Sequence, residues 1–129
     1  MKKWLVPCNV KNFNILEHFK SHTTAMFKKN RALAVGDEVY IYVAKPYSEI
    51  LFKGVVVRSA VNPSEVDKMY RVPGANEKHF IEVQLVKSFP QHTFTAEALK
   101  QNGIGQVVNQ QIIRGQAESY ISATEAGLV

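Results

Sequence analysis

Hydrophobic and polar residues alternate most regularly in the middle of the chain. The segment Glu38–Val43 places valine and isoleucine on one face and two tyrosines on the other. Alternation with many β-branched and aromatic residues is typical of a strand. A turn at Lys45–Ser48 separates this segment from a second strand-like run, Ile50–Val57. We therefore expect the two segments to pair, and Gly54 in the second predicts a bulge or a close approach of another backbone.

Other segments have weaker patterns. Lys3–Pro7 predicts a short first strand that ends at its proline, and His79–Val86 alternates like a third long strand. Residues 107–113 fit either a strand or an extended loop. Residues 22–34 show no clear period, and residues 62–77 are polar and contain proline and glycine, so we expect both to be loops.

Short helices are expected at three places. Apolar residues recur at helical spacing within residues 14–21, and Asn14 stands three residues before Glu17, as in a capping box. Thr95–Lys100 begins with a residue that commonly caps helices. Glu118–Ala126 would form the last helix.

The order of these elements favours an α+β fold. Several short strands with a few short helices, and no alternation of strand and helix, predict a closed or partly closed mixed β-barrel of about five to six strands with short peripheral helices. The chain has 129 residues, of which 46% are hydrophobic, and this is enough for one domain over residues 1–129. The composition excludes disordered and collagen-like chains.

The cysteine content and the N-terminus bear on location. Cys8 is the single cysteine, so the chain forms no internal disulfide, as expected in a reducing cytoplasm. The apolar run Trp4–Val6 stops at Pro7 and is too short for a signal peptide. No stretch approaches the roughly 20 apolar residues of a membrane-spanning helix. We expect a cytoplasmic protein with no membrane partner.

The net charge of +5 is unevenly distributed. Residues 1–36 hold seven basic side chains and one acidic side chain, whereas residues 37–129 hold nine basic and ten acidic ones. A localised basic field suits a polyanion such as nucleic acid. A solvated lysine-rich face gives the same count, so charge alone leaves both interpretations open.

Motifs for catalysis, cofactors and metals are weak. His18 and His22 have the spacing of helical metal ligands, but no glutamate lies between them and no third ligand is evident. Cys8 beside a strand end is typical of a packed small hydrophobe. Gly103 and Gly105 lack the third glycine and the lysine of phosphate-binding loops. We expect no enzyme, no cofactor and no metal site.

Several motifs in about the first sixty residues occur in a characteristic order. They are Trp4–Asn9, the basic and aromatic stretch Phe27–Arg31, Val35–Asp37 before the first paired strand, and Pro46–Ser48 before Ile50. In this combination the sequence resembles the EVE domain family, a branch of the PUA-like superfamily related to YTH and ASCH domains. Phe27 stands where the family often has tryptophan, and Asn109–Arg114 matches the family's C-terminal segment only loosely.

The resemblance implies a small PUA-like barrel that receives a flipped, modified base in an aromatic-walled pocket. For EVE-like domains that base is a modified cytosine in DNA, so DNA is favoured over RNA as the partner. Base extraction costs a few kcal/mol, and stacking on aromatic faces returns about 1–3 kcal/mol per base. The expected pocket residues are Trp4, Pro7, Asn9, Tyr42, Tyr47, Ser48 and Phe52. The residues expected to hold phosphates are Lys28, Lys29, Arg31 and Arg114.

These residues also have structural interpretations. Trp4 and Phe52 fit core positions as well as pocket walls, Tyr42 fits the barrel surface, and Asn9 fits a turn. The turn that carries Tyr47 is the strongest candidate, because exposed aromatic residues on anchored loops often bind ligands.

Other functions stay open at this point. YTH relatives recognise a methylated base in RNA. An ASCH-like domain that binds or hydrolyses nucleosides would need a reactive group in its pocket, for instance Lys53 or Cys8. A protein-binding module would instead expose a large apolar patch. Bacterial EVE domains are linked to restriction of modified DNA, and a chain of this size would need a separate nuclease partner for cleavage.

Overall fold

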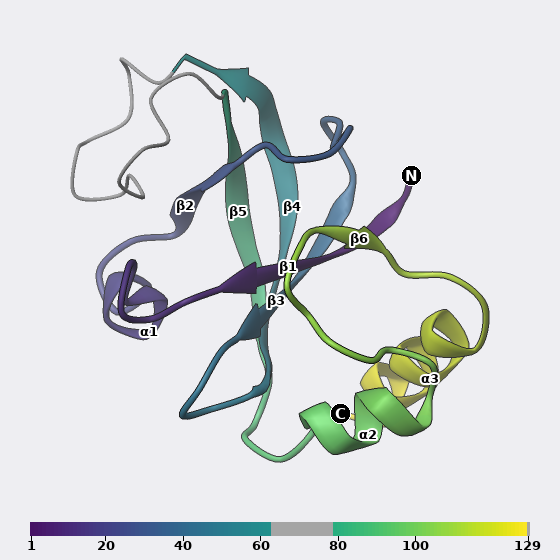
Figure 1. The fold of residues 1–129 in the computed structure, drawn as a ribbon. Helices are drawn as coiled ribbons and strands as arrows, with labels where there is room; N and C mark the ends of the chain where they lie inside the picture. The colour runs from purple at the N-terminus through teal and green to yellow at the C-terminus, as the bar shows by residue number, and fades with distance from the viewer. Residues whose placement is uncertain (63–78, 129) are drawn as a thin grey trace.

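The computed structural model describes residues 1–62 and 79–128, in which six strands form one mixed sheet (Figure 1). Along the sheet the strands follow the order β2-β5-β4-β3-β1-β6. Neighbouring strands are antiparallel except β1 and β3, which are parallel. The strands are β1 (Lys3–Cys8), β2 (Thr24–Lys28), β3 (Glu38–Val43), β4 (Glu49–Val61), β5 (Phe80–Ser88) and β6 (Gln111–Ile112).

The helices of the described residues are short, and two of them begin at the predicted caps. They are α1 (Ile15–His18), α2 (Ala96–Gln101) and α3 (Gly115–Ala126). The side chains of Asn14 and Thr95 each accept a backbone N–H at 3.2 Å, from Glu17 and Ala98. In Figure 1, α2 and α3 lie together and stand apart from α1. None of these helices is long and apolar enough to cross a membrane.

Two hydrophobic clusters cover the two faces of the sheet. Val39 and Ile41 of β3 belong to the cluster that contains Ile15 of α1. Tyr40, between them in the sequence, belongs to the other cluster, together with Ile121 of α3. Because successive residues of a strand point to opposite faces, β3 is buried on both sides. The predicted division of this strand into an aliphatic face and a tyrosine face is confirmed.

The fold class agrees with the sequence-based expectation, and the sheet of the described residues is open rather than closed into a barrel. The described residues form an α+β structure with six strands and short peripheral helices. The sheet is not closed, because β2 and β6 lie at its two edges. β3 has the predicted bounds, and β4 extends beyond Ile50–Val57 at both ends. The register of β4 and β5 shifts next to Gly54, at the predicted irregularity.

The loop predicted over residues 22–34 is wrong in its first half, because this part forms β2. Ala25 and Phe27 are buried, and their neighbours in the strand are only partly buried. β2 pairs with β5 over its whole length. The strand has only five residues, and Met26 places an apolar side chain on its less buried face. The alternation of apolar and polar residues expected of a strand is therefore not visible in the sequence of β2.

Smaller differences concern the ends of elements. α1 is shorter than the predicted 14–21, and α3 begins at Gly115 rather than at Glu118. β6 is a two-residue strand within the ambiguous segment 107–113. Apart from Asn62, the loop predicted over residues 62–77 lies outside the described residues.

Candidate ligand-binding cavity

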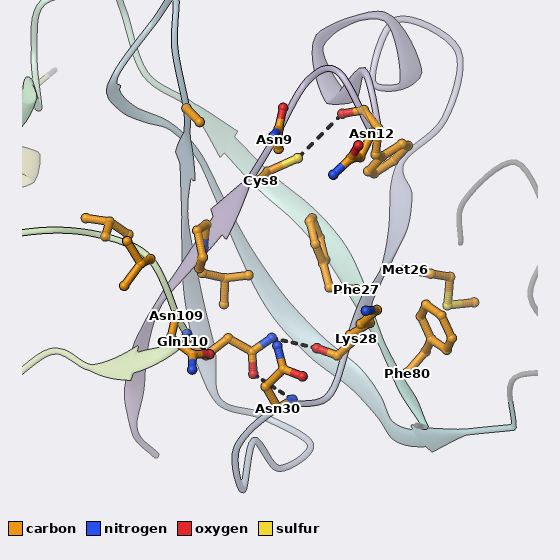
Figure 2. Close-up of a pocket in the computed structure, with 16 residues that line it drawn as sticks. Cys8, Asn9, Asn12, Met26, Phe27, Lys28, Asn30, Phe80, Asn109 and Gln110 are labelled. Atoms are coloured by element: carbon orange, nitrogen blue, oxygen red, sulfur yellow. Dashed lines mark hydrogen bonds between the residues drawn. The ribbon is translucent and has the colours of Figure 1, made fainter. Parts of the chain in front are cut away.

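A cavity of about 420 Å³ lies where the sheet is open, between β1 and β2 (Figure 2). β6 pairs with Trp4 and Leu5, so the part of β1 after Leu5 has a free edge within the described structure. β2 is an edge strand as well. Val6–Cys8 line the cavity from β1, and Met26–Lys28 line it from β2. The cavity therefore occupies the gap between two strand edges.

Aromatic rings and other apolar side chains form much of the wall. Phe13, which precedes α1, and Phe27 of β2 meet edge to face, with ring centroids 6.1 Å apart and an interplanar angle of 69°. Phe80 of β5 and the pair Val107 and Val108 add further apolar surface. A wall of this kind suits a flat apolar face, such as that of an aromatic ring.

The polar groups of the lining are mainly side-chain amides. They belong to Asn9, Asn12, Asn30, Asn109 and Gln110. Lys28 adds a positive charge, and the lining described here contains no aspartate or glutamate. The Asn9 side-chain oxygen accepts the Lys11 N–H at 2.9 Å, and the Asn109 oxygen accepts the Gln110 N–H at 2.8 Å. These bonds leave both amide nitrogens as donors, so the cavity favours a ligand with acceptor groups.

Gln110 joins the two edges of the open sheet. Its side-chain nitrogen donates to the Lys28 carbonyl at 2.5 Å, and its side-chain oxygen accepts the Asn30 N–H at 3.0 Å. The residue directly precedes β6, whereas Lys28 ends β2. Gln110 is 4% exposed. A buried amide that pairs with both a donor and an acceptor replaces the missing strand–strand hydrogen bonds at this point.

Replacing Gln110 with alanine is expected to lower the free energy of unfolding by about 1–3 kcal/mol, because a carbonyl and an N–H lose their buried partner. Urea unfolding followed by circular dichroism measures this change. Gln106→Ala is the matched control, since Gln106 lies in the same connecting segment and is exposed. Equal stability of the two variants would show that the Gln110 bridge does not hold the edges together.

Cys8 lies in the wall as a neutral thiol. Its Sγ is 3.6 Å from the Phe13 carbonyl oxygen, to which it donates. Burial raises the pKa of this thiol to about 12. A thiol that stays protonated at neutral pH is a poor nucleophile and a poor metal ligand. Cys8 thus packs as a small hydrophobic residue, as its position in the sequence suggested.

The structure brings only part of the predicted site together. Pro7, Asn9 and Lys28 line the cavity. Trp4 and Phe52 are core residues instead, exposed by 3% and 7%. The Trp4 indole N–H donates to Asp37 Oδ2 at 2.9 Å, and the Phe52 ring packs edge to face on Phe19.

The predicted tyrosines and serine do not line this cavity either. Tyr42 packs against the cluster beneath α2 and α3, and Tyr47 packs against the cluster on the opposite face. Ser48 has a positive φ of 51°, and its carbonyl accepts the Ala96 N–H at 2.9 Å. This segment forms the turn between β3 and β4.

The remaining predicted cations lie outside the lining. The Lys29 N–H donates to the His79 carbonyl at 2.9 Å, which continues the pairing of β2 with β5. Arg31 is exposed, and its guanidinium donates to the carbonyl of Asn30, a lining residue. Arg114 is exposed and immediately precedes α3. Of these three, Arg31 is therefore the one bonded directly to a residue of the cavity wall.

Sequence reasoning missed much of the lining. Phe27 and Asn30 belong to a stretch that the sequence marked as basic and aromatic, but its strand was not predicted. Asn109 and Gln110 belong to the C-terminal segment that the family resemblance pointed to. Phe13 had no signal beyond its hydrophobicity. These residues meet only in the tertiary structure, Phe27 through the pairing of β2 with β5 and Gln110 through its hydrogen bonds to Lys28 and Asn30.

Lys53, the other reactive residue considered, lies in an ion-paired cluster under α3. Its ammonium is 2.8 Å from Glu125 Oε2 and 3.0 Å from Glu38 Oε2, and the Tyr40 hydroxyl donates to Glu125 Oε1 at 2.6 Å. Burial lowers the pKa of Lys53, but its hydrogen bonds to the two carboxylates outweigh burial, so that the pKa is raised. An amine held in its charged form is not a nucleophile. The cluster ties α3 to the sheet.

Solved structures with a similar fold include ASCH and YTH domains. The crystal structure of ASCH from Zymomonas mobilis has a TM-score of 0.70 and 9% identity, over 95% of this chain and 94% of that chain. A protein from Pseudomonas syringae has a TM-score of 0.68 and 18% identity, over 94% and 97%. The MmI1 YTH domain has a TM-score of 0.60 and 12% identity, over 99% and 98%. No family model and no curated protein matches the sequence.

These likenesses establish the fold. The chain has the PUA-like fold of ASCH and YTH domains, as the resemblance to EVE domains implied. The similarity extends over nearly the whole chain.

Proposed function

We propose that this chain is a nucleic-acid-binding module that receives one modified base in the cavity between β1 and β2. Modified cytosine in DNA is the expected ligand, and a modified base in RNA is the alternative. The observation that carries the proposal is the lining itself, in which aromatic rings, amide groups and a lysine meet and no carboxylate is present. The fold shared with a YTH domain supports the same class of ligand.

The chemistry of a base matches each part of this lining. Its π-face stacks on aromatic rings such as those of Phe13 and Phe27, with a gain of about 1–3 kcal/mol. Its ring nitrogens and carbonyl oxygens accept hydrogen bonds from the amide nitrogens of Asn9 and Asn109. Its phosphates are anionic, and Lys28 lies at the cavity. A volume of about 420 Å³ falls within the range of about 300–1,000 Å³ that small-molecule sites occupy.

Binding without chemical conversion is part of the proposal. The Cys8 thiol in the wall is protonated, and Lys53 is held as an ammonium by two glutamates and does not line the cavity. Cleavage of a marked nucleic acid would then require a separate nuclease. An ASCH-like hydrolase activity is the rival, and release of product from a modified nucleoside would reveal it.

Fluorescence titration with labelled oligonucleotides tests the proposal. Single-stranded and duplex DNA, and RNA, would each carry plain, 5-methylated or 5-hydroxymethylated cytosine at one position. We expect tighter binding to one modified form than to the plain sequence. Negligible or equal binding to all of them would overturn base recognition, and a preference confined to RNA would favour the alternative.

Lys28→Gln is expected to reduce the salt dependence of binding. Loss of one phosphate contact makes the negative slope of log K against log salt concentration shallower by about one. Titrations at several salt concentrations measure this slope. Lys100→Gln is the control, because Lys100 is exposed on α2 and does not line the cavity. An unchanged slope for Lys28→Gln would remove this lysine from the phosphate contacts.

A further inference from the structure

The hydrogen bonds of β2 alternate between β5 and the free edge. The Leu85 N–H donates to the Thr23 carbonyl at 2.7 Å, and the Lys29 N–H donates to the His79 carbonyl at 2.9 Å. In an antiparallel pair, every second residue exchanges hydrogen bonds with its partner, and the residues between them point their backbone groups the other way. By the register of β2 and β5, the backbone groups of Thr24, Met26 and Lys28 therefore point to the free edge.

Side chains occupy the two ends of this free edge. The His18 ring Nε2 donates to the Thr24 carbonyl at 2.7 Å, and the Gln110 side chain donates to the Lys28 carbonyl at 2.5 Å. Both bonds agree with the outward direction inferred from the register. Met26 lies between them and lines the cavity. In residues 1–62 and 79–128, its N–H and its carbonyl have no hydrogen-bond partner.

The opposite edge of the cavity presents a carbonyl. The Cys8 carbonyl accepts the Ala44 N–H at 2.9 Å on the β3 side, whereas the Lys3 carbonyl accepts the Ile113 N–H at 2.8 Å on the other side. By the same alternation, the Pro7 carbonyl points away from β3, toward the free edge. Proline has no N–H, so this edge offers an acceptor and no donor at that position. Pro7 also lines the cavity.

We propose that the main chain of Met26, a neighbouring N–H and C=O between the His18 and Gln110 contacts, pairs with the hydrogen-bonding edge of the bound base. This inference rests on the proposed function and names how the same cavity recognises its ligand. The Watson–Crick edge of cytosine offers a ring nitrogen acceptor beside an amino donor, which complements such a pair. The Pro7 carbonyl supplies a further acceptor for an amino group.

The length of the free edge favours a base over a peptide. A peptide that adds a strand to a sheet edge pairs along several residues. Here the side chains of His18 and Gln110 block the edge on either side of Met26, so within residues 1–62 and 79–128 a single residue of this edge is open. A small planar group with a donor and an acceptor side by side fits this opening.

Hydrogen exchange of the individual backbone amides, followed by NMR, tests the orientation in the free protein. The Met26 amide is expected to exchange faster than those of Ala25 and Phe27, which point to β5. Addition of the oligonucleotide that binds best in the titrations should slow the Met26 amide about tenfold or more at saturation. Protection of Met26 in the free protein equal to that of its neighbours would overturn the inference.

Two variants distinguish the contribution of the Met26 main chain to binding from that of its side chain. Met26→Pro removes the outward N–H, which an edge strand tolerates because this group is not in the ladder, and should weaken oligonucleotide binding about tenfold. Met26→Leu keeps the N–H and should therefore lose less binding than Met26→Pro. Val57→Leu is the control for unchanged binding, because Val57 is exposed on β4 and does not line the cavity. Circular dichroism establishes whether Met26→Pro folds, and the exchange measurement on the unchanged protein decides the matter if it does not.

The failure of this inference is distinct from failure of the proposed function. Binding of a modified oligonucleotide with no change at the Met26 amide would overturn main-chain recognition and leave the function intact. Absence of binding by every oligonucleotide would overturn both. Protection of Met26 by an extended peptide, without protection by nucleic acid, would also overturn the inference and point to a protein partner.

Discussion

Replacing Asp37 with alanine is expected to lower the free energy of unfolding by about 3–5 kcal/mol. The Asp37 carboxylate is 5% exposed and accepts three hydrogen bonds, from the Trp4 indole at 2.9 Å, the Ala34 N–H at 3.0 Å and the Lys2 N–H at 3.1 Å. Alanine leaves these three donors without their partner at the start of β3. Urea unfolding measures the loss. Asp37→Asn retains the shape and one oxygen, and should lose less.

The same carboxylate makes stability depend on acid pH. Burial raises the pKa of Asp37, but hydrogen bonds from Ala34, Trp4 and Lys2 outweigh burial and lower it. A carboxyl with a lower pKa in the folded state stabilises the fold above its unfolded pKa of about 4, and loses that contribution as the pH falls through the folded value. The unchanged protein should thus lose stability in acid more steeply than Asp37→Ala. If the free energy of unfolding fell equally with pH in the unchanged protein and in Asp37→Ala, this role of Asp37 would be contradicted.

This contact explains what the N-terminal sequence motif encodes. The tryptophan of β1 and the aspartate that follows Gly36 belong to the ordered motifs that resemble the EVE domain family. Their hydrogen bond joins β1 to the start of β3, and Gly36 has a positive φ of 93° in the turn that precedes β3. The motif therefore encodes a contact that stabilises the fold. This is why the resemblance predicted the fold correctly but placed Trp4 in the wall of the pocket. Trp4 is a core residue because its N–H has a buried acceptor.

The cavity residues at the end of β1 could be predicted from the sequence, whereas most of those that lie on or next to β2 could not. Pro7 and Asn9 follow directly from the first strand, and Lys28 follows from the local cluster of positive charge. Gln110 binds backbone groups 80 and 82 residues earlier in the chain, and nothing local marks such a contact. Phe27 became part of the wall only because the segment around it pairs with β5.

The cavity follows from how the sheet ends. A closed barrel would pair the backbone of β1 beyond Leu5 and that of β2, and it would leave their N–H and C=O groups with no capacity for a ligand. In the described part of this chain, β6 pairs with Trp4 and Leu5 and leaves the end of β1 open, and the Gln110 amide bridges the gap at one point. The fold thus keeps two strand edges apart at a fixed place, lined by aromatic and amide side chains. Under the proposed function, this opening is where a small planar group would bind.

Gly54→Ala is expected to lower the free energy of unfolding by about 3 kcal/mol, the upper part of the usual range for overpacking. A Cβ at this position would overlap a methyl group of Val83 and lie 2.7 Å from the Gln84 carbonyl oxygen. The backbone oxygen belongs to β5, so relief requires β4 and β5 to separate. Because β5 carries β2, this movement also displaces one wall of the cavity.

Urea unfolding and oligonucleotide titration check the two consequences of Gly54→Ala. Gly105→Ala is the matched control, since a Cβ there would meet nothing within 4 Å, and it should leave both stability and binding unchanged. Weaker binding by Gly54→Ala, under conditions in which the variant is folded, would show that the spacing of β4 and β5 sets the geometry of the cavity. Unchanged stability would mean that β5 relaxes without cost, which contradicts the close approach of the two backbones.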